Sequence, residues 1–255
     1  MAGITGSQSA ARADVSNAGS ADGRDDVQML AYWISLGAAA GGFGGGLIGG
    51  VGGRLAMFFL RLTSRSSIRG LTSDDGFIIG RFDPVDTLRL IGLTAVLGSI
   101  VGLVMVAGRP FLPRRGQSLA WALAGGITGG ALLIHRDGVD FNLLEPHWFA
   151  VALFVAIPAI GAGLIQWLIE KYSRFWWRRR RWTVFASIAA VPTLIAFPVA
   201  ALATLIGGLW WIALRLPGAR RFATLTATRI AAGVVFGLVV LLGLIDLTRD
   251  VHAIV

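Results

Sequence analysis

The feature that most constrains this chain is a series of apolar blocks, each close to the length of a membrane span. About 30 Å of hydrocarbon requires roughly 20 residues at about 1.5 Å rise per residue. A helix on the surface of a soluble domain needs only an apolar stripe and keeps a polar opposite face. The blocks here are apolar on every face, so the sequence predicts an all-α, polytopic transmembrane helix bundle with almost no soluble domain.

Composition agrees with this class. Of the 255 residues, 55% are hydrophobic and 15% are charged, whereas a soluble domain carries about 25% charged residues. We attribute the formal net charge of +9 to arginines that flank helices and meet anionic lipid head groups, rather than to nucleic-acid binding. The sequence contains no cysteine, which excludes disulfides, thiolate catalysis and thiolate-bound metals.

The apolar blocks predict about six spans in one transmembrane domain, residues 29–255. A polar tail, residues 1–28, precedes it; the tail lacks apolar anchors and is expected to be disordered. The tail also lacks the basic start and early apolar core of a signal peptide. The predicted spans are approximately 29–62, 87–107, 118–135, 148–169, 183–214 and 229–247.

Glycines four residues apart recur in these spans. A helix face without Cβ atoms lets another helix backbone approach closely, so we predict that these faces pack inside the bundle or against a second copy of the chain. For the first span the alternative is a broken helix with a non-helical middle. The predicted packing glycines are Gly41, Gly45, Gly49 and Gly53 in the first span, Gly125 and Gly129 in the third, and Gly233 and Gly237 in the last.

The segment KYSRFWWRRRRW, residues 171–182, sets the predicted topology. Short arginine-rich loops stay on the cytoplasmic side, and Trp and Tyr lie at the head-group level. We therefore place this segment and the N-terminus inside a bacterial cytoplasmic membrane; a bacterial source is indicated by the preference for Arg over Lys with abundant Ala and Gly. The expected contacts with anionic head groups are made by Arg174, Arg178, Arg179, Arg180 and Arg181.

The block 183–214 is ambiguous in this scheme. Its length is long for one untilted crossing and short for two. We favour one long, tilted, proline-kinked helix, which puts the arginines of 215–229 outside. A re-entrant hairpin is the alternative, and it puts those arginines inside and the C-terminus outside.

Two loops that this topology places outside hold most acidic residues beyond the tail. Carboxylates and imidazoles together can bind a divalent cation or perform acid–base chemistry. No metal-ligand spacing such as HExxH is present, however, and ordinary ion pairs at the head groups account for the same residues. The loop residues of this candidate polar site are Asp74, Asp75, Arg81, His135, Asp137, Asp140, Glu145 and His147.

Arg54 completes the candidate polar site. It follows the glycine run and precedes the apolar stretch LAMFFL, and a charge inside the membrane is costly enough to indicate a function. Snorkelling from near a helix end, with the true membrane span ending at Gly53, is the equal alternative. Glu170 and Asp246 stand at span ends, where solvation accounts for them.

No motif assigns an activity. A P-loop, a GxSxG elbow and a metal-binding motif are all missing from the sequence, so it indicates no catalytic residue, no cofactor and no metal ligand. We expect a non-enzymatic helix-bundle membrane component. The alternatives are a small transporter or channel that uses Arg54 and the acidic outer loops, and a membrane enzyme acting on a lipid-type substrate.

Three stretches carry a resemblance to known sequences. GGRLAMFFLRLTS (52–64), RGLTSDDGFIIGRF (69–82) and HRDGVDFNLLEPHWFAVALFVAIPA (135–159) resemble a family of uncharacterised multi-spanning membrane proteins of actinobacteria. The likeness covers the larger part of the chain. That family has no assigned activity, so the resemblance implies a membrane location and a helical fold, and it implies no site residues.

Overall fold

The computed structural model describes residues 29, 32–63, 83–109, 116–135, 146–175 and 226–254. Every element within these ranges is a helix, and none is a strand. The first helix, Tyr32–Thr63, comprises α-helical residues 32–44, the π-helix η1 (Gly45–Gly52) and α2 (Gly53–Thr63). The other helices are α3 (Pro84–Gly108), α4 (Gln117–Leu133), α6 (His147–Phe175) and α10 (Thr226–Ile254).

Four helices are long and apolar enough to cross a membrane. They are the first helix and the segments Pro84–Gly108, His147–Ser173 and Ile230–Ile254, which confirms the predicted all-α class and supports the membrane character. α4 has 17 residues, or roughly 26 Å, and falls short of about 30 Å of hydrocarbon. The predicted count of six also depends on the block 183–214, which lies outside the described residues, as do residues 1–28.

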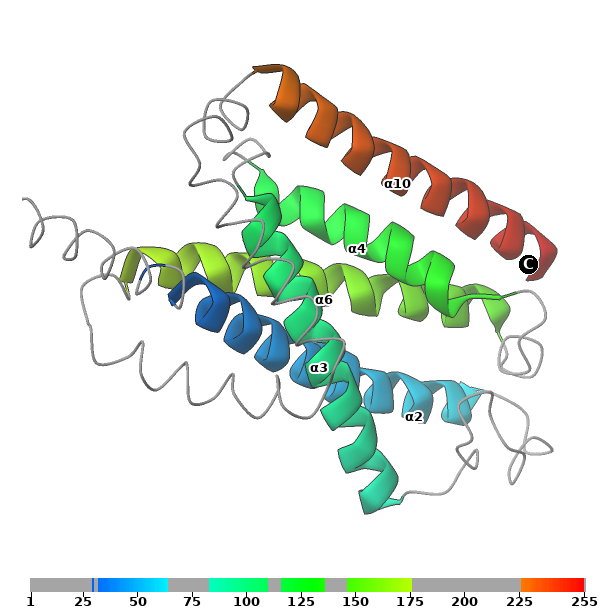
Figure 1. The fold of residues 1–255 in the computed structure, drawn as a ribbon. Helices are drawn as coiled ribbons and strands as arrows, with labels where there is room; N and C mark the ends of the chain where they lie inside the picture. The colour runs from blue at the N-terminus through cyan, green and yellow to red at the C-terminus, as the bar shows by residue number, and fades with distance from the viewer. Residues whose placement is uncertain are drawn as a thin grey trace, which may run out of the picture.

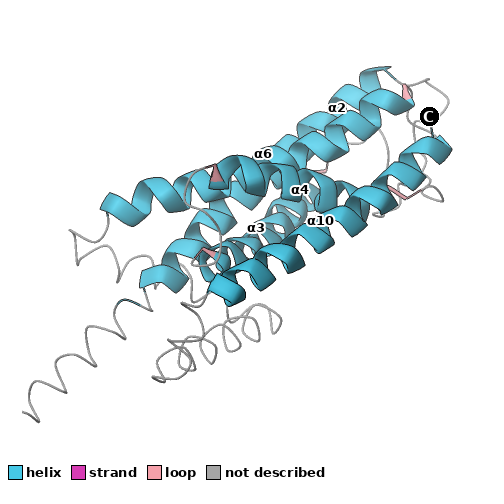
Figure 2. Cartoon of the chain, turned by 90° about the horizontal axis from the view of Figure 1, so that it is seen from above, coloured by secondary structure: helices cyan, strands magenta, loops and turns pink. Residues whose placement is uncertain are grey.

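The helices run back and forth between two ends of an elongated bundle (Figures 1 and 2). At one end, here called the Arg109 end, α3 and α6 finish while the first helix, α4 and α10 begin. Tyr32 Oη donates to the Tyr172 carbonyl oxygen there at 3.0 Å. At the opposite end, the His135 end, the first helix, α4 and α10 finish and α6 begins (Figure 1). One apolar cluster joins Leu60, Ala131, Ile134, Ala150 and Leu247 there.

The course of α6 and α10 bears on the block 183–214. α6 finishes and α10 begins at the same end of the bundle (Figure 1). The block 183–214 itself lies outside the described residues, so its interpretation as one tilted crossing stays a prediction.

The glycine run of the first span remains helical. Residues 32–63 form one continuous helix, so the alternative of a non-helical middle is wrong. The helix changes at Gly45–Gly52 from α to π geometry, in which the hydrogen bonds reach one residue further than in an α-helix. Gly53, at the end of this stretch, donates its N–H to the carbonyl oxygens of Gly49 and Gly50.

Helix backbones meet directly near the middle of the bundle. A Cβ atom on Gly41 would overlap the carbonyl oxygen of Gly98, and one on Gly45 would overlap the carbonyl oxygen of Thr94. Ser99 joins the same two helices, since its Oγ donates to the Ala38 carbonyl oxygen at 3.0 Å. Over this stretch no side chain separates the first helix from α3.

Small residues also bring α4 against α6. A Cβ on Gly125 would lie 2.5 Å from the Ala162 Cβ, and one on Gly129 would lie 2.5 Å from the Pro158 Cβ. Pro158 lies inside α6, which continues through it as one helix. The bare face of Gly129 thus accommodates the proline ring.

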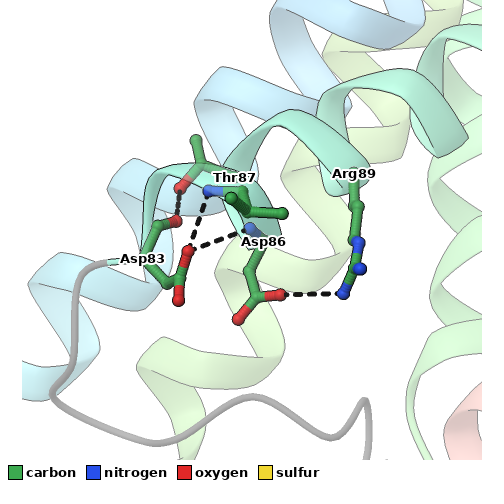
Figure 3. A network of polar contacts seen from close by, with 5 residues as sticks. Asp83, Asp86, Thr87 and Arg89 are labelled. Carbon is green, nitrogen blue, oxygen red and sulfur yellow. Dashed lines mark hydrogen bonds and ion pairs between the residues drawn. The ribbon is translucent and has the colours of Figure 1, made fainter.

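α3 begins with a capped first turn (Figure 3). The Asp83 side chain accepts hydrogen bonds from the backbone N–H groups of Val85 at 2.8 Å and Asp86 at 3.4 Å. Pro84 occupies the first helical position, where a missing N–H costs nothing. Arg89 pairs with Asp86 at 3.5 Å and its side chain is 76% exposed, so this arginine reaches outward.

Gly98→Ala should destabilise the bundle, because the added methyl group would lie 2.7 Å from the Gly45 Cα. We expect a loss of about 3 kcal/mol in the free energy of unfolding, typical of an overpacked core. Titration with SDS in mixed micelles, followed by circular dichroism, measures it. The matched control is Gly92→Ala on the same helix, where a Cβ meets nothing within 4 Å; equal losses in both variants would contradict the close backbone contact.

Candidate functional site

A layer of polar side chains crosses the bundle at the Arg109 end. Gln117 in the first turn of α4 and Gln166 on α6 are 4% and 0% exposed. Gln166 Nε2 donates to Gln117 Oε1 at 3.0 Å and to Glu170 Oε1 at 3.1 Å. Two amides and a carboxylate therefore meet inside an otherwise apolar bundle, where every polar group needs a partner.

The two hydrogen bonds fix the orientation of the Gln166 amide. Both N–H groups of Nε2 point at acceptors, and this leaves Oε1 buried with no hydrogen-bond donor among the described residues. A buried acceptor without a donor costs about 1–3 kcal/mol. The layer can accept one further donor, such as a water molecule.

Local sequence explains why these groups meet. Gln166 and Glu170 are four residues apart on α6, so they share a face of that helix. Gly116 precedes Gln117 with a φ of 78°, a conformation that glycine adopts without strain. The chain can therefore enter α4 sharply enough to begin the helix with Gln117 in the core.

Two basic residues lie beside tryptophans at the same end of the bundle. The Arg109 guanidinium lies 4.8 Å from the centre of the Trp33 ring, and its Nη2 donates to Ser173 Oγ at 3.3 Å. Lys171 Nζ lies 4.5 Å from the centre of the Trp167 ring. Cation–π pairs of this kind suit the boundary between lipid and water, where tryptophans and basic residues gather.

Arg54 is the second residue of α2, which follows η1 directly. Its side chain is partly buried, and its Nε and Nη2 atoms are shielded from solvent. The helix continues to Thr63, so Arg54 does not stand at a helix end. The alternative that the membrane span ends at Gly53, from which Arg54 would snorkel, stays a prediction.

Most loop residues of the candidate polar site lie outside the described part of the chain. His135 is exposed just after α4, and His147 opens α6 with its Nδ1 buried and without a hydrogen-bond partner among the described residues. Both histidines lie at the His135 end. Within the described ranges no three His, Asp or Glu side chains are grouped closely enough to hold a metal. The residues outside those ranges are Asp74, Asp75, Arg81, Asp137, Asp140 and Glu145.

The eight predicted packing glycines have different surroundings. Those that lie against another helix are Gly41, Gly45, Gly49, Gly125 and Gly129. Those at which an added Cβ would meet nothing within 4 Å are Gly53, Gly233 and Gly237. The contact surface on the partner helix α3 includes Gly98 and Gly102, whose added Cβ atoms would overlap the carbonyl oxygens of Gly41 and Gly37.

Sequence reasoning missed the polar layer. Gln166 interrupts the apolar span 148–169, and an isolated amide inside a span is a signal for hydrogen bonding between helices. The interpretation of Glu170 as a solvated span-end residue omits the hydrogen bond that it accepts from Gln166. Gln117 lies one residue before the predicted third span and carries no comparable signal.

Comparison with known proteins adds no further residue to the site. No protein-family model, no curated protein and no solved structure matches this chain. The chemistry of the described side chains is the guide to function.

Gln117→Leu should destabilise the protein by about 2 kcal/mol, because it leaves one buried N–H of Gln166 without an acceptor. The double variant Gln117→Leu/Gln166→Leu should recover most of that loss, since neither buried amide then remains. A double-mutant cycle of unfolding free energies in mixed micelles measures the coupling. Strictly additive losses would show that the two amides do not interact.

Proposed function

We propose that this chain is a multi-spanning helix-bundle component of a bacterial cytoplasmic membrane that acts through its fold and its surfaces rather than through catalysis. The observation that carries this proposal is the backbone contact between Gly41 and Gly98 in the middle of the bundle. A closely packed centre suits a rigid scaffold and leaves little room for a substrate path.

The apolar exterior supports the membrane location. In the apolar stretch of α10, 6% of the residues are buried inside the structure, against 50% in the first helix. Leu238 and Leu242 on α10 and Leu132 on α4 are all at least half exposed. Continuous apolar surface of this kind in water promotes association, whereas lipid covers it without cost.

We place the Arg109 end on the cytoplasmic side. The arginine-rich segment 171–182 includes the end of α6, and the segment 215–229 runs into the start of α10. Both helix ends lie at the Arg109 end, so both groups of arginines then face the cytoplasm, as the positive-inside rule favours. This arrangement requires the re-entrant alternative for 183–214, with the N-terminus inside and the C-terminus outside.

We also propose two partners of the chain, anionic lipid head groups and a second copy of the chain. Arg174 and the arginines at 178–181 contact anionic head groups on the cytoplasmic side. A second copy of the chain is a further partner, supported by Gly233 and Gly237, where an added Cβ on α10 would meet nothing within 4 Å and a neighbouring helix can approach. We also propose that the chain belongs to the actinobacterial family of membrane proteins that its sequence resembles.

A small transporter or channel is the alternative that Arg54 favours. This arginine follows a π-helix, and π-helical turns are frequent at functional sites. A groove lies between α4 and α10, however, and Arg54 is not among the residues that line it. An enzyme acting on a lipid-type substrate would depend on the acidic loop residues, which lie outside the described ranges.

Single-cysteine variants test the topology, because the chain contains no cysteine of its own. Ala227 and Ala253 are exposed alanines near the two ends of α10. In right-side-out vesicles a membrane-impermeant maleimide should label Ala253→Cys, whereas Ala227→Cys should react only after permeabilisation. The reverse pattern would overturn the orientation, and labelling of both variants from one side would show that α10 does not cross.

Arg54→Cys tests the scaffold proposal against transport. With a closed bundle centre, a water-soluble thiosulfonate should modify Arg54→Cys as slowly as Phe58→Cys, a position on α2 that is 50% exposed on the apolar exterior. Ala253→Cys provides the rate for a residue in water. If Arg54→Cys reacts as fast as Ala253→Cys in a folded variant, a water-filled path reaches this residue and the scaffold proposal fails.

A further inference from the structure

An open groove runs between α4 and α10. Its volume is about 510 Å³, and it is open to the outside of the bundle. Most of its lining is apolar, including Leu132, Val239, Leu242 and Ile245, and the charged side chains of Asp246 and Arg249 complete it.

Small residues where the two helices touch create this space. A Cβ on Gly243 of α10 would lie 3.4 Å from Thr128 Cγ2 on α4, so the helices approach closely at this point. Leu247 is 8% exposed and packs over Gly130. These contacts hold the helices together while Gly243 and Thr128 contribute little side-chain bulk to the wall of the groove.

Along the axis of α10 the groove has an apolar end and a charged end. From Val239 to Arg249 the α10 wall rises roughly 15 Å over ten residues. Val239 lies toward the centre of the bundle, and Asp246 and Arg249 lie toward the His135 end, where α10 finishes. A phospholipid in a bilayer has the same polarity, with its acyl chains toward the centre and its head group at the surface.

Asp246 and Arg249 are separated by less than one turn of α10 and are both exposed. Neither forms an ion pair within the described part of the chain. Unpaired charges on a membrane-facing helix surface are costly. An ammonium group can pair with the carboxylate, and a phosphate can pair with the guanidinium through charge-assisted hydrogen bonds.

We infer that this groove binds a zwitterionic phospholipid whose head group carries a primary ammonium. The phosphate meets Arg249, the ammonium reaches back to Asp246 less than one turn away, and an acyl chain follows Leu242 toward Val239. Charge complementarity selects this occupant: a trimethylammonium head group has no N–H to donate to Asp246, and a glycerol head group brings no cation. The inference rests on the membrane location proposed above and adds the class of lipid.

Native mass spectrometry of the full-length protein in detergent micelles tests the inference. The probes are phosphatidylethanolamine, phosphatidylcholine and phosphatidylglycerol with identical acyl chains. The protein should retain phosphatidylethanolamine about tenfold more strongly than phosphatidylcholine, equivalent to one charge-assisted hydrogen bond. Asp246→Asn should abolish that preference, and Arg249→Gln should weaken retention of all three lipids.

Two further variants make the test specific to the groove. Asp250→Asn removes a carboxylate one turn further along α10 that does not line the groove, and it should keep the wild-type preference. Leu242→Trp, at a position that is 65% exposed, should fill the groove and lower retention of every lipid. Thermal midpoints without added lipid establish that each variant is folded.

Three results would overturn the inference: equal retention of the ethanolamine and choline lipids, loss of the preference in Asp250→Asn, or a preference for phosphatidylglycerol. Failure of the membrane proposal itself has a different signature. A chain that does not insert would be recovered from cells without detergent and would retain none of the three lipids.

Discussion

The approach of the Gly41 backbone to the Gly98 backbone is the contact on which the arrangement of this bundle depends. Lipid tails are as apolar as leucine side chains, so burial of apolar surface gives helices in a membrane little reason to associate. Close van der Waals packing has to supply the attraction, and it needs surfaces that fit without gaps. The glycines supply such a surface between the first helix and α3. The first helix and α3 also contact α6, which packs on α4, which in turn packs on α10.

Side chains at helix contacts are small in the middle of the bundle, where Gly41 meets Gly98, and larger toward both ends. The middle is narrow, with Gly41, Gly98 and Gly125 at helix contacts. Larger side chains fill the space toward both ends: one cluster contains Leu36, Met105 and Ile169, and the other contains Leu60 and Ile134. Helices that meet on glycine in the middle and on leucine or isoleucine further out diverge from the point of closest contact.

The helical class could be predicted from the sequence, because lipid requires long apolar blocks and a chain can meet that requirement in few ways. The site could be predicted only in part. An all-apolar span has no amphipathic face, so its sequence does not reveal which side of α6 meets α4, and Gln166 could not be paired with Gln117 in advance. The spacing of Gly41 and Gly45 indicated a contact without identifying α3 as the partner. The single crossing favoured for 183–214 is an argument from length alone, and that block lies outside the described residues.

The π-helix η1 has a consequence for how the two halves of the first helix are coupled. Each of its turns closes with one residue more than an α-helical turn. The stretch Gly45–Gly52 therefore sets how far α2 is rotated about the helix axis relative to residues 32–44. Loss of one glycine from this stretch would let a turn rewind into α geometry and rotate α2 by about 100° around its axis. Leu60, now 0% exposed, would turn away from its cluster, and Arg54 would face a different neighbour. The number of glycines in this run, and not only their small size, decides which side of α2 faces the protein interior.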